Sequence, residues 1–304
     1  MNETTEPAER LAMAITEDRG IRKEVALKKA EEFLHFMKAL NDGRMNLKGR
    51  PDPKYWLDTM FFYKGRGTIV FASQGQGKTN LCAYLITRAL VLHPDWVILT
   101  NVPFFWDFEE FGVTDLRPGR IVSVSTMSQM LREMANIILK GQIPVIILDE
   151  LDQVLTSYNY RKKSMDDWMH FIFVERHFKV RGPLMIYHEF KHIPNYLRSG
   201  DLLNERLFLT IHDGKRYILS RKTKPFKLVI TESTIPYSTH GLKGFNIDVN
   251  MGELEETLNA GTSEGLARQI LQYLNEFEKE KEISRKRSEA GRKGAEATWH
   301  KEDN

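Results

Sequence analysis

The chain has 304 residues, of which 41% are hydrophobic, enough for a substantial core. Its one cysteine, Cys82, excludes an internal disulfide and a zinc site built from cysteines, and no apolar run approaches the ~18–20 residues of a membrane span. The formal net charge is only +3, so any nucleic acid must bind to a local basic patch rather than to the surface as a whole.

The first residues of the chain are polar. The opening MNETTEPAER lacks the basic and then apolar segments of a secretory signal peptide, so we expect an intracellular, soluble protein. Residues 1–17 are predicted to be mobile, apart from a turn or two of helix over 9–15. Apolar residues then recur at helical spacing over 22–40, which predicts an amphipathic helix that ends at Asn41-Asp42-Gly43. The Arg-Pro-Asp-Pro stretch at 50–53 is typical of a linker, and aromatic residues over 55–62 are expected to dock it onto the core.

A glycine-rich loop follows the first predicted strand, over 67–71. Residues 72–79 match the phosphate-binding pattern G-x-x-x-x-G-K-[ST] except that Ala72 replaces the first glycine. Alanine is small enough for that position if its φ stays negative. Helical spacing over 80–92 completes the order strand, loop, helix, which a phosphate site at a helix N-terminus requires. The alternative is a glycine turn that carries an incidental lysine.

Each residue type in this loop has a role in holding a nucleotide. Gly75 and Gly77 let backbone N–H groups turn inward around an anion. Lys78 can reach the β- and γ-phosphates, and the Thr79 hydroxyl can bind Mg²⁺. The predicted nucleotide contacts are Ser73, Gln74, Gly75, Gln76, Gly77, Lys78, Thr79 and Asn80.

Further strands are predicted over 96–100, 120–125, 143–148 and 184–187, with a helix over 126–140. Two apolar runs, 207–211 and 217–219, flank His-Asp-Gly-Lys at 212–215, which predicts a hairpin. Strands that alternate with helices predict a mainly parallel sheet, and the hairpin predicts an antiparallel edge. The predicted fold class is therefore α/β, a P-loop NTPase core with an N-terminal helix and a C-terminal helical appendage.

Two acids follow the 143–148 run, at the strand end where open α/β sheets bind ligands. Asp149 can hold Mg²⁺ directly or through water, and Glu150 can orient and deprotonate an attacking water. Such pairs also arise by chance, because loops favour acids. Together with the phosphate loop in the same predicted sheet, they indicate ATP hydrolysis.

Three further residues are catalytic candidates. His188 follows the 184–187 run and can contact the γ-phosphate; the alternative is a strand end that simply turns polar. Arg176 and Arg181 precede that run, and either can stabilise transition-state charge if it is supplied across a subunit interface. Surface arginines are common, so neither is preferred.

Beyond residue 231 the chain changes character. An extended segment over 231–247 and two short helices, over 253–258 and 266–277, are predicted. Residues 284–301 carry six Lys or Arg and no aliphatic side chain larger than alanine, so we expect a flexible tail. This tail, with Trp299, can bind DNA phosphates and bases; the alternative is a solvated charge run. The predicted divisions are an N-terminal extension (1–53), the ATPase core (54–231), a C-terminal segment (232–283) and the basic tail (284–304).

Four features together resemble the FtsK–HerA superfamily of P-loop motors, and most of all its Zot-like and archaeal-virus or plasmid ATPases. They are the loop 72–79, the strand end Thr100-Asn101, the pair Asp149-Glu150 and Arg176-His177 before a strand. The resemblance covers about residues 66–215. It implies a RecA-like core that uses ATP and Mg²⁺, in which Lys78, Thr79, Asp149 and Glu150 have the roles given above. The family usually has glutamine or asparagine at the position of His188, so this chain departs from the family pattern there.

The resemblance also implies a ring of identical subunits, often a hexamer, that pulls double-stranded DNA through a channel, including into viral capsids. Zot-like proteins often carry a membrane segment, which is not found in this sequence. We therefore expect a packaging or mobile-element transfer motor, in the host cytoplasm or the virion. A RecA-type signalling or assembly ATPase that acts on protein partners remains open. A small-molecule kinase is less well supported, because nothing resembles an arginine-rich lid or an acceptor site.

Overall fold

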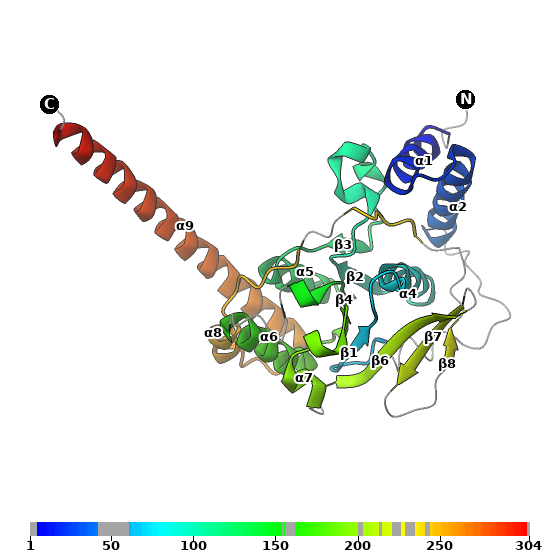
Figure 1. Cartoon of the computed structure of the whole chain (residues 1–304). Helices are drawn as coiled ribbons and strands as arrows, with labels where there is room; N and C mark the ends of the chain where they lie inside the picture. Colours follow the sequence, from blue (N-terminus) through cyan, green and yellow to red (C-terminus); the bar gives the residue numbers. More distant parts are fainter. Residues whose placement is uncertain are drawn as a thin grey trace.

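The structure is a computed structural model that describes residues 5–41, 61–153, 155, 162–199, 203–212, 215–220, 226–228, 235–240 and 244–302. At its centre is an 8-stranded sheet with the strand order β3-β2-β4-β5-β1-β6-β7-β8. Helices cover both faces of the sheet (Figure 1). The strands are β1 (Gly67–Phe71), β2 (Trp96–Thr100), β3 (Ile121–Ser123), β4 (Ile143–Leu148), β5 (Arg181–Tyr187), β6 (Leu203–His212), β7 (Lys215–Ser220) and β8 (Phe226–Leu228). The α-helices are α1 (Thr5–Arg19), α2 (Lys23–Asn41), α4 (Lys78–Leu92), α5 (Met127–Leu139), α6 (Lys162–Val174), α7 (Asn195–Ser199), α8 (Met251–Thr257) and α9 (Ser263–Glu302).

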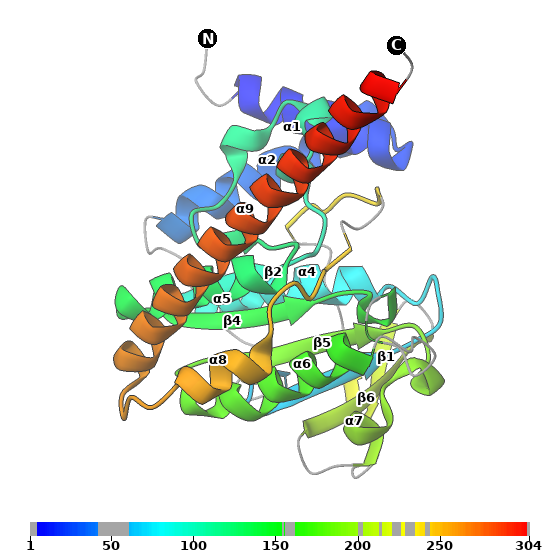
Figure 2. The same ribbon diagram turned by 90° about the vertical axis from the view of Figure 1, so that its left-hand side faces the viewer.

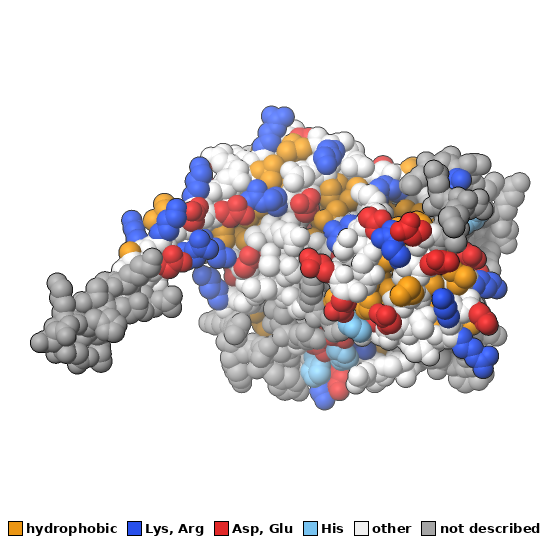
Figure 3. Space-filling view, turned by 90° about the horizontal axis from the view of Figure 1, so that it is seen from above, with side chains coloured by type: hydrophobic (Ala, Val, Ile, Leu, Met, Phe, Trp, Pro, Cys, Tyr) orange, Lys and Arg blue, Asp and Glu red, His pale blue; other side chains and the backbone are white. Residues whose placement is uncertain are grey.

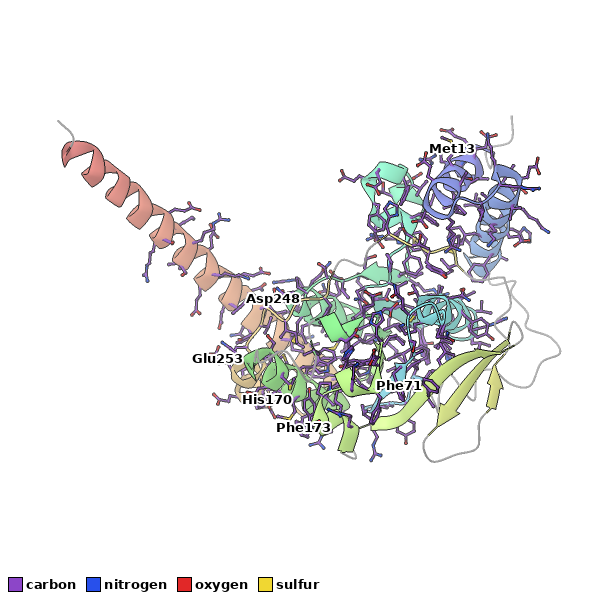
Figure 4. All side chains as sticks on the ribbon, viewed as in Figure 1. Met13, Phe71, His170, Phe173, Asp248 and Glu253 are labelled. Carbon is purple, nitrogen blue, oxygen red and sulfur yellow. The ribbon has the colours of Figure 1, made fainter. Side chains whose placement is uncertain are left out.

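The strands from β3 to β6 in this order run parallel, and β7 and β8 continue the sheet antiparallel. This arrangement confirms the predicted α/β P-loop NTPase fold with its antiparallel edge. Strand residues alternate between two cores, as the pleat requires. In β4, Val145 and Ile147 face the core under α4, whereas Ile146 and Leu148 face the core under α5, α6 and α9. Side chains fill the space on both sides of the sheet (Figure 4).

The strand order fixes where the predicted catalytic residues lie. β5 lies between β1 and β4, so one strand separates the phosphate loop from the acid pair. The residue that follows β5, His188, therefore lies between them. All the predicted strands are present. Helix α6 and strand β8 were not predicted, and the hairpin turn at 213–214 lies outside the described residues.

The N-terminal helix is longer than predicted. The expectation that residues 1–17 are mobile is wrong for the described ones, because α1 runs from Thr5 to Arg19. Leu11, Ala12 and Ile15 on α1 are buried, as are Ala26 and Ala30 on α2. The small alanines let the two helices pack closely, and burial of this stripe outweighs the polar composition of the rest of the helix. Figure 1 shows the pair standing above the sheet on one side.

The C-terminal helix also differs from the prediction. In place of a short helix and a flexible tail, α9 continues unbroken for 40 residues to Glu302. Its first turns pack against α5, where Arg132 donates to Asn275 at 2.9 Å and pairs with Glu278 at 2.8 Å. Four side chains of α9 are buried in that contact: Leu266, Ala267, Ile270 and Leu274.

The outer part of α9 leaves the body of the protein as an arm (Figures 1 and 2). Every side chain from Glu278 to Ala290 is exposed. Ion pairs one turn apart, Lys286 with Glu282 at 2.7 Å and Arg285 with Glu289 at 3.5 Å, lie along this arm. Pairs at this spacing stabilise isolated helices, which is why a segment too polar to build a core is still helical here.

Two other expectations concern the linker and membranes. The predicted linker at 50–53 lies outside the described residues, but Phe61 and Phe62, at the end of the aromatic docking segment, are fully buried. In the part of the chain that the structure describes, no helix has the length and apolar character needed to cross a bilayer.

Candidate functional site

The phosphate loop has the backbone conformation that its sequence predicts. It joins β1, whose last residue Phe71 is marked in Figure 4, to the N-terminus of α4. Gly75 and Gly77 have φ angles of 77° and 69°, in the left-handed region that glycine adopts without a steric cost. Among the described non-glycine residues only Glu150 has a positive φ, so Ala72 meets the condition on which its place in the motif depends.

Lys78 folds back over the loop. Its Nζ donates to the carbonyl oxygens of Ala72 at 2.8 Å and Ser73 at 3.1 Å, and its side chain is nearly buried. Burial lowers the pKa of Lys78, against the opposing effect of Asp149 and the other nearby carboxylates. The ammonium group is thus held inside the cradle by two carbonyl groups whose place a phosphate can take.

Thr79 and Asp149 meet at the mouth of the loop. The Thr79 hydroxyl donates to Oδ2 of Asp149 at 2.7 Å, and Asp149 is 1% exposed. Burial raises the pKa of Asp149, and the hydrogen bond from Thr79 partly opposes this effect. Asn101, at the end of the neighbouring strand β2, binds the backbone of Asp149 through two hydrogen bonds. Its Nδ2 donates to the Asp149 carbonyl at 2.9 Å, and its Oδ1 accepts from the Asp149 N–H at 2.7 Å.

These groups fit Mg²⁺. Magnesium prefers oxygen ligands, keeps several waters and is bound in proteins by one or two carboxylates together with substrate phosphates. One hydroxyl and one buried carboxylate beside a phosphate cradle match that description. The described residues contain no group of three or more His, Cys, Asp or Glu that could form an all-protein metal cage. Thr79 and Asp149 are the residues that would hold the ion.

Glu150 has a strained backbone. Its φ of 52° is unusual for a residue with a side chain, and such positions cost about 1–3 kcal/mol. Its N–H donates to Oδ1 of Asp149 at 2.9 Å, and its side chain remains 28% exposed. The turn sends the two acids in different directions: Asp149 is buried, and Glu150 lines a cleft that it shares with the phosphate loop.

Asp152 holds His188 in one orientation. It lies in a short 3-10 turn after β4, Leu151–Gln153, and accepts from His188 Nδ1 at 2.8 Å and from the His188 N–H at 3.2 Å. His192 Nδ1 lies 3.1 Å from the same carboxylate. Burial acts to raise the pKa of Asp152, but the two histidines hold it below its usual value. A carboxylate only accepts, so Nδ1 of His188 carries a proton, and Nε2 lies 3.7 Å from Oε1 of Glu150.

The two candidate arginines lie at the opposite end of the sheet. Arg181 begins β5, whose other end leads to His188, and its guanidinium lies 5.6 Å from the centre of the Trp96 ring. Arg176 lies in a 3-10 turn, Glu175–His177, whose backbone packs against Gly65, just before β1. Because the parallel strands place the cleft at their carboxyl ends, neither arginine contacts the phosphate loop of this chain.

The loop, Glu150 and His188 line one cleft of about 390 Å³, within the size range of ligand pockets. Gln74, Gly75, Gly77, Lys78, Thr79 and Asn80 line it from the loop side. Of the other predicted contacts, Ser73 gives its carbonyl to Lys78, and Gln76 donates its N–H to the Ser73 carbonyl at 3.3 Å. Figure 3 shows histidine side chains beside acidic ones on one face of the protein.

Several residues of this site had no predicted role. Asn101 and His192 are part of it, and so are four consecutive residues, 237–240, which line the cleft from the far side. Asn101 is named above only as part of the family resemblance; it follows a strand at the same end of the sheet as the acid pair, so the strand-end rule could have given it a role in the site. The segment 237–240 belongs to no motif, and only the folded chain brings it to the cleft.

No protein-family model matches this sequence, and no curated protein sequence matches it. Among solved structures, the chain is similar to a genome packaging NTPase from Sulfolobus turreted icosahedral virus 2 in complex with AMP, with a TM-score of 0.37, 10% identity, and coverage of 53% of this chain and 96% of that one. The complex of that NTPase with ATP-gammaS gives a TM-score of 0.38 and 9% identity, covering 54% and 96%. A KaiC-like protein from Pyrococcus horikoshii OT3 gives 0.39 and 16%, covering 58% and 90%. At these values the similarities do not assign the chain to a family.

Proposed function

We propose that the protein is a Mg²⁺-dependent ATPase that works as an oligomeric motor on double-stranded DNA. The observation that carries the ATPase proposal is the hydrogen bond of 2.7 Å between Thr79 and Asp149, with Glu150 beside it at the same cleft. A protein that only holds a nucleotide has no need of an acid directly after the metal-binding aspartate.

The residues of the cleft divide the work of hydrolysis. Lys78 exchanges its two carbonyl partners for phosphate oxygens, and the loop N–H groups bind the rest of the phosphate chain. A bound Mg²⁺, held by Thr79 and Asp149, would offset charge on the β- and γ-phosphates. Glu150 orients a water for attack on the γ-phosphorus and takes its proton as the bond to the β–γ bridging oxygen breaks, which leaves ADP and phosphate.

His188 supports Glu150. Because Asp152 fixes the proton on Nδ1, the lone pair of Nε2 in the neutral ring faces the cleft beside Oε1 of Glu150. These two atoms are both acceptors, so they form no hydrogen bond with each other, and at 3.7 Å they are positioned to share a water that donates to both. His188 therefore holds the attacking water together with Glu150.

Assembly into a ring is the second part of the proposal. Arg176 and Arg181 lie at the end of the sheet opposite the cleft of their own subunit, so either can serve only a neighbour. The motif resemblance to FtsK–HerA motors supports a ring, often a hexamer, that moves DNA into a viral capsid or through a transfer complex. Within the resemblance, His188 replaces the usual glutamine or asparagine.

The charge of the arm favours an alternative function in which the partner is a protein. Its side chains over 278–290 comprise five Lys or Arg and four Glu, so this stretch is not strongly basic. A mixed-charge helix that leaves the body also suits a protein partner, which favours a RecA-type assembly or signalling ATPase as the second candidate function.

Phosphate release from ATP tests these proposals in one series. We expect turnover that requires Mg²⁺, rises with duplex DNA and loses that stimulation as salt increases. The mass of the assembly with ATP and Mg²⁺, with and without DNA, checks the ring. If DNA changes neither turnover nor assembly at any salt concentration, the assembly or signalling ATPase is favoured. Absence of ATP turnover would contradict the ATPase proposal.

A further inference from the structure

The far wall of the cleft comes from outside the parallel sheet. Tyr237, Ser238, Thr239 and His240 line the cleft opposite the phosphate loop. They belong to an extended segment, residues 235–240, which we call the strap. In Figure 1 the strap lies within the gold trace that passes between α4 and the α1–α2 pair.

Backbone hydrogen bonds fasten the strap at several points. The N–H of Ile235 donates to the Thr87 hydroxyl on α4 at 3.0 Å, and the N–H of Ser238 donates to the Pro103 carbonyl at 2.8 Å. The next two N–H groups, those of Thr239 and His240, donate to the carboxylate of Asp18 at 2.7 and 3.1 Å.

Asp18 is the main anchor. Its side chain is 0% exposed, and it also accepts from the hydroxyls of Ser238 at 2.6 Å and Thr239 at 2.9 Å. Burial acts to raise the pKa of Asp18, but the hydrogen bonds from the strap outweigh this effect and hold it below its usual value. A carboxylate in the last turn of α1 is disfavoured by the helix dipole. The bonds to the strap compensate for that position, so α1 and the wall of the cleft are held together by one buried acid.

Two of the strap residues that line the cleft, Tyr237 and His240, carry rings. Its N–H groups at 238–240 and the hydroxyls of Ser238 and Thr239 donate within the protein, so they are poorly placed to bind phosphate. The Arg19 guanidinium lies 4.3 Å from the centre of the Tyr237 ring, and the His240 ring lies 5.2 Å from that of Phe111. The edge of the His240 ring is held by two carboxylates, with Nδ1 2.8 Å from Asp18 and Nε2 3.3 Å from Glu110. Such rings suit a nucleobase, since stacking tolerates any base.

We propose that the strap is the nucleoside-binding wall of the cleft and that Asp18 is the residue that positions it. Tyr237 and His240 contact the base and ribose, while the loop and Lys78 hold the phosphates. The N-terminal helix pair thereby governs nucleotide affinity without touching the ligand. This inference rests on the proposed function, because it requires that the cleft bind a nucleoside triphosphate.

Two probes separate the nucleoside from the phosphates: a non-hydrolysable ATP analogue and inorganic tripolyphosphate, both titrated with Mg²⁺ by calorimetry. His240→Ala is expected to weaken the analogue about tenfold, as removal of a stacking ring does, and to leave tripolyphosphate affinity unchanged. Asp18→Asn is expected to act in the same way, because the amide group turns a donor toward the donors of the strap. Asp115→Asn, which removes an exposed ion pair with Arg10 of α1, is the matched control and is expected to change neither affinity.

Hydrogen exchange of the parent protein tests the proposal without variants, which could fold poorly. The analogue is expected to slow hydrogen exchange of the Thr239 and His240 amides, relative to those of α8, and tripolyphosphate is not. An equal loss of affinity for both probes would place the strap against the phosphates and overturn the proposal. Unchanged affinities in well-folded variants would also overturn it. The same holds if the analogue does not change the hydrogen-exchange rates of the Thr239 and His240 amides. If the parent binds neither probe, the proposed function itself is wrong.

Discussion

The hydroxyl of Thr79 and the carboxylate of Asp149 lie 2.7 Å apart, although 70 positions separate them in the chain. The contact joins the first turn of α4 to the end of β4, across the strand β5 that lies between β1 and β4. It brings the two oxygen groups that suit Mg²⁺ to the mouth of the phosphate loop, and the other parts of the proposed mechanism are arranged around it.

Removal of the Lys78 ammonium is expected to abolish ATP binding or nearly so. Lys78→Ala deletes the positive charge that the loop carries and leaves its carbonyl groups facing the phosphates. Charge-assisted hydrogen bonds are each worth about 1.5–3 kcal/mol, so a loss of at least about a hundredfold is expected by calorimetry. Lys140→Ala, at an exposed position after α5, is the control. Equal affinities in the Lys78 variant and the parent would refute the phosphate-loop assignment.

Asp152 is expected to act through His188. Asp152→Asn frees the imidazole to turn, so we expect kcat to fall about tenfold with little change in KM, less than the ~10²–10⁴-fold that loss of an acid–base group costs. In a double-mutant cycle, Asp152→Asn should cost nothing further in a His188→Ala background, because the group that it orients is gone. Losses that multiply would show that Asp152 acts by another route, such as through His192.

An arginine supplied in trans is expected to make activity depend on assembly. Specific activity should rise with protein concentration as rings form. Subunits carrying Arg176→Ala or Arg181→Ala should regain turnover when they are mixed with Glu150→Gln subunits, because a hybrid interface can combine an intact arginine with an intact acid. No recovery with either arginine in demonstrably mixed oligomers removes both as candidates.

Asp18 is expected to stabilise the fold only at pH values at which its carboxylate is charged. Its pKa is lowered by the strap, so its contribution is complete above the pKa of an unfolded aspartate, about 3.9, and is lost as the pH falls through the lower pKa of the folded state. His240 and Arg19 are its ionisable neighbours. We expect the difference in unfolding free energy between the parent and Asp18→Asn to be fully present at pH 5, to begin shrinking near pH 4 and to be smaller still at pH 3. Denaturant titrations at these pH values check this, and a difference that grows as the pH falls would contradict it.

Deletion of residues 284–304 is expected to weaken duplex DNA binding without changing basal ATP turnover. The deletion removes basic residues of the arm, so fewer DNA phosphates are neutralised. The slope of log affinity against log salt should therefore become shallower, by roughly 0.9 for each phosphate that the shortened protein no longer neutralises. An unchanged affinity and slope would leave DNA binding to the core. Such a result would also fit the mixed charge of the arm and favour a protein partner.

Local sequence signals were sufficient to predict the loop and the acid pair. The loop works through residues that are close together in the sequence, namely Gly75, Gly77, Lys78 and Thr79. Asp149 follows a parallel strand, and the carboxyl ends of such strands lie at the same end of the sheet as the loop. The fold class followed from the alternation of strands and helices. These features depend on residue type and spacing, which a sequence displays directly.

The features that the sequence did not predict depend on long-range contact. α1 forms a full helix because its apolar side chains pack against α2. The far wall of the cleft is held in place because Asp18 binds residues 238–240, which lie more than two hundred positions away in the chain. The helical arm depends on ion pairs along a surface that composition alone describes as too polar to fold. No local pattern distinguishes these outcomes from a mobile terminus or a solvated tail.

Glu150→Gln tests the central claim most directly. The carboxamide keeps the shape of the side chain but cannot accept a proton from water, so the variant should bind ATP with the affinity of the parent while its turnover falls about 10²–10⁴-fold. Glu189→Gln, at an exposed acid near His188 that pairs with Lys191, is the matched control and should keep the parent rate. A Glu150→Gln variant that retains more than about half of the parent rate would contradict the account, because another group would then be the base.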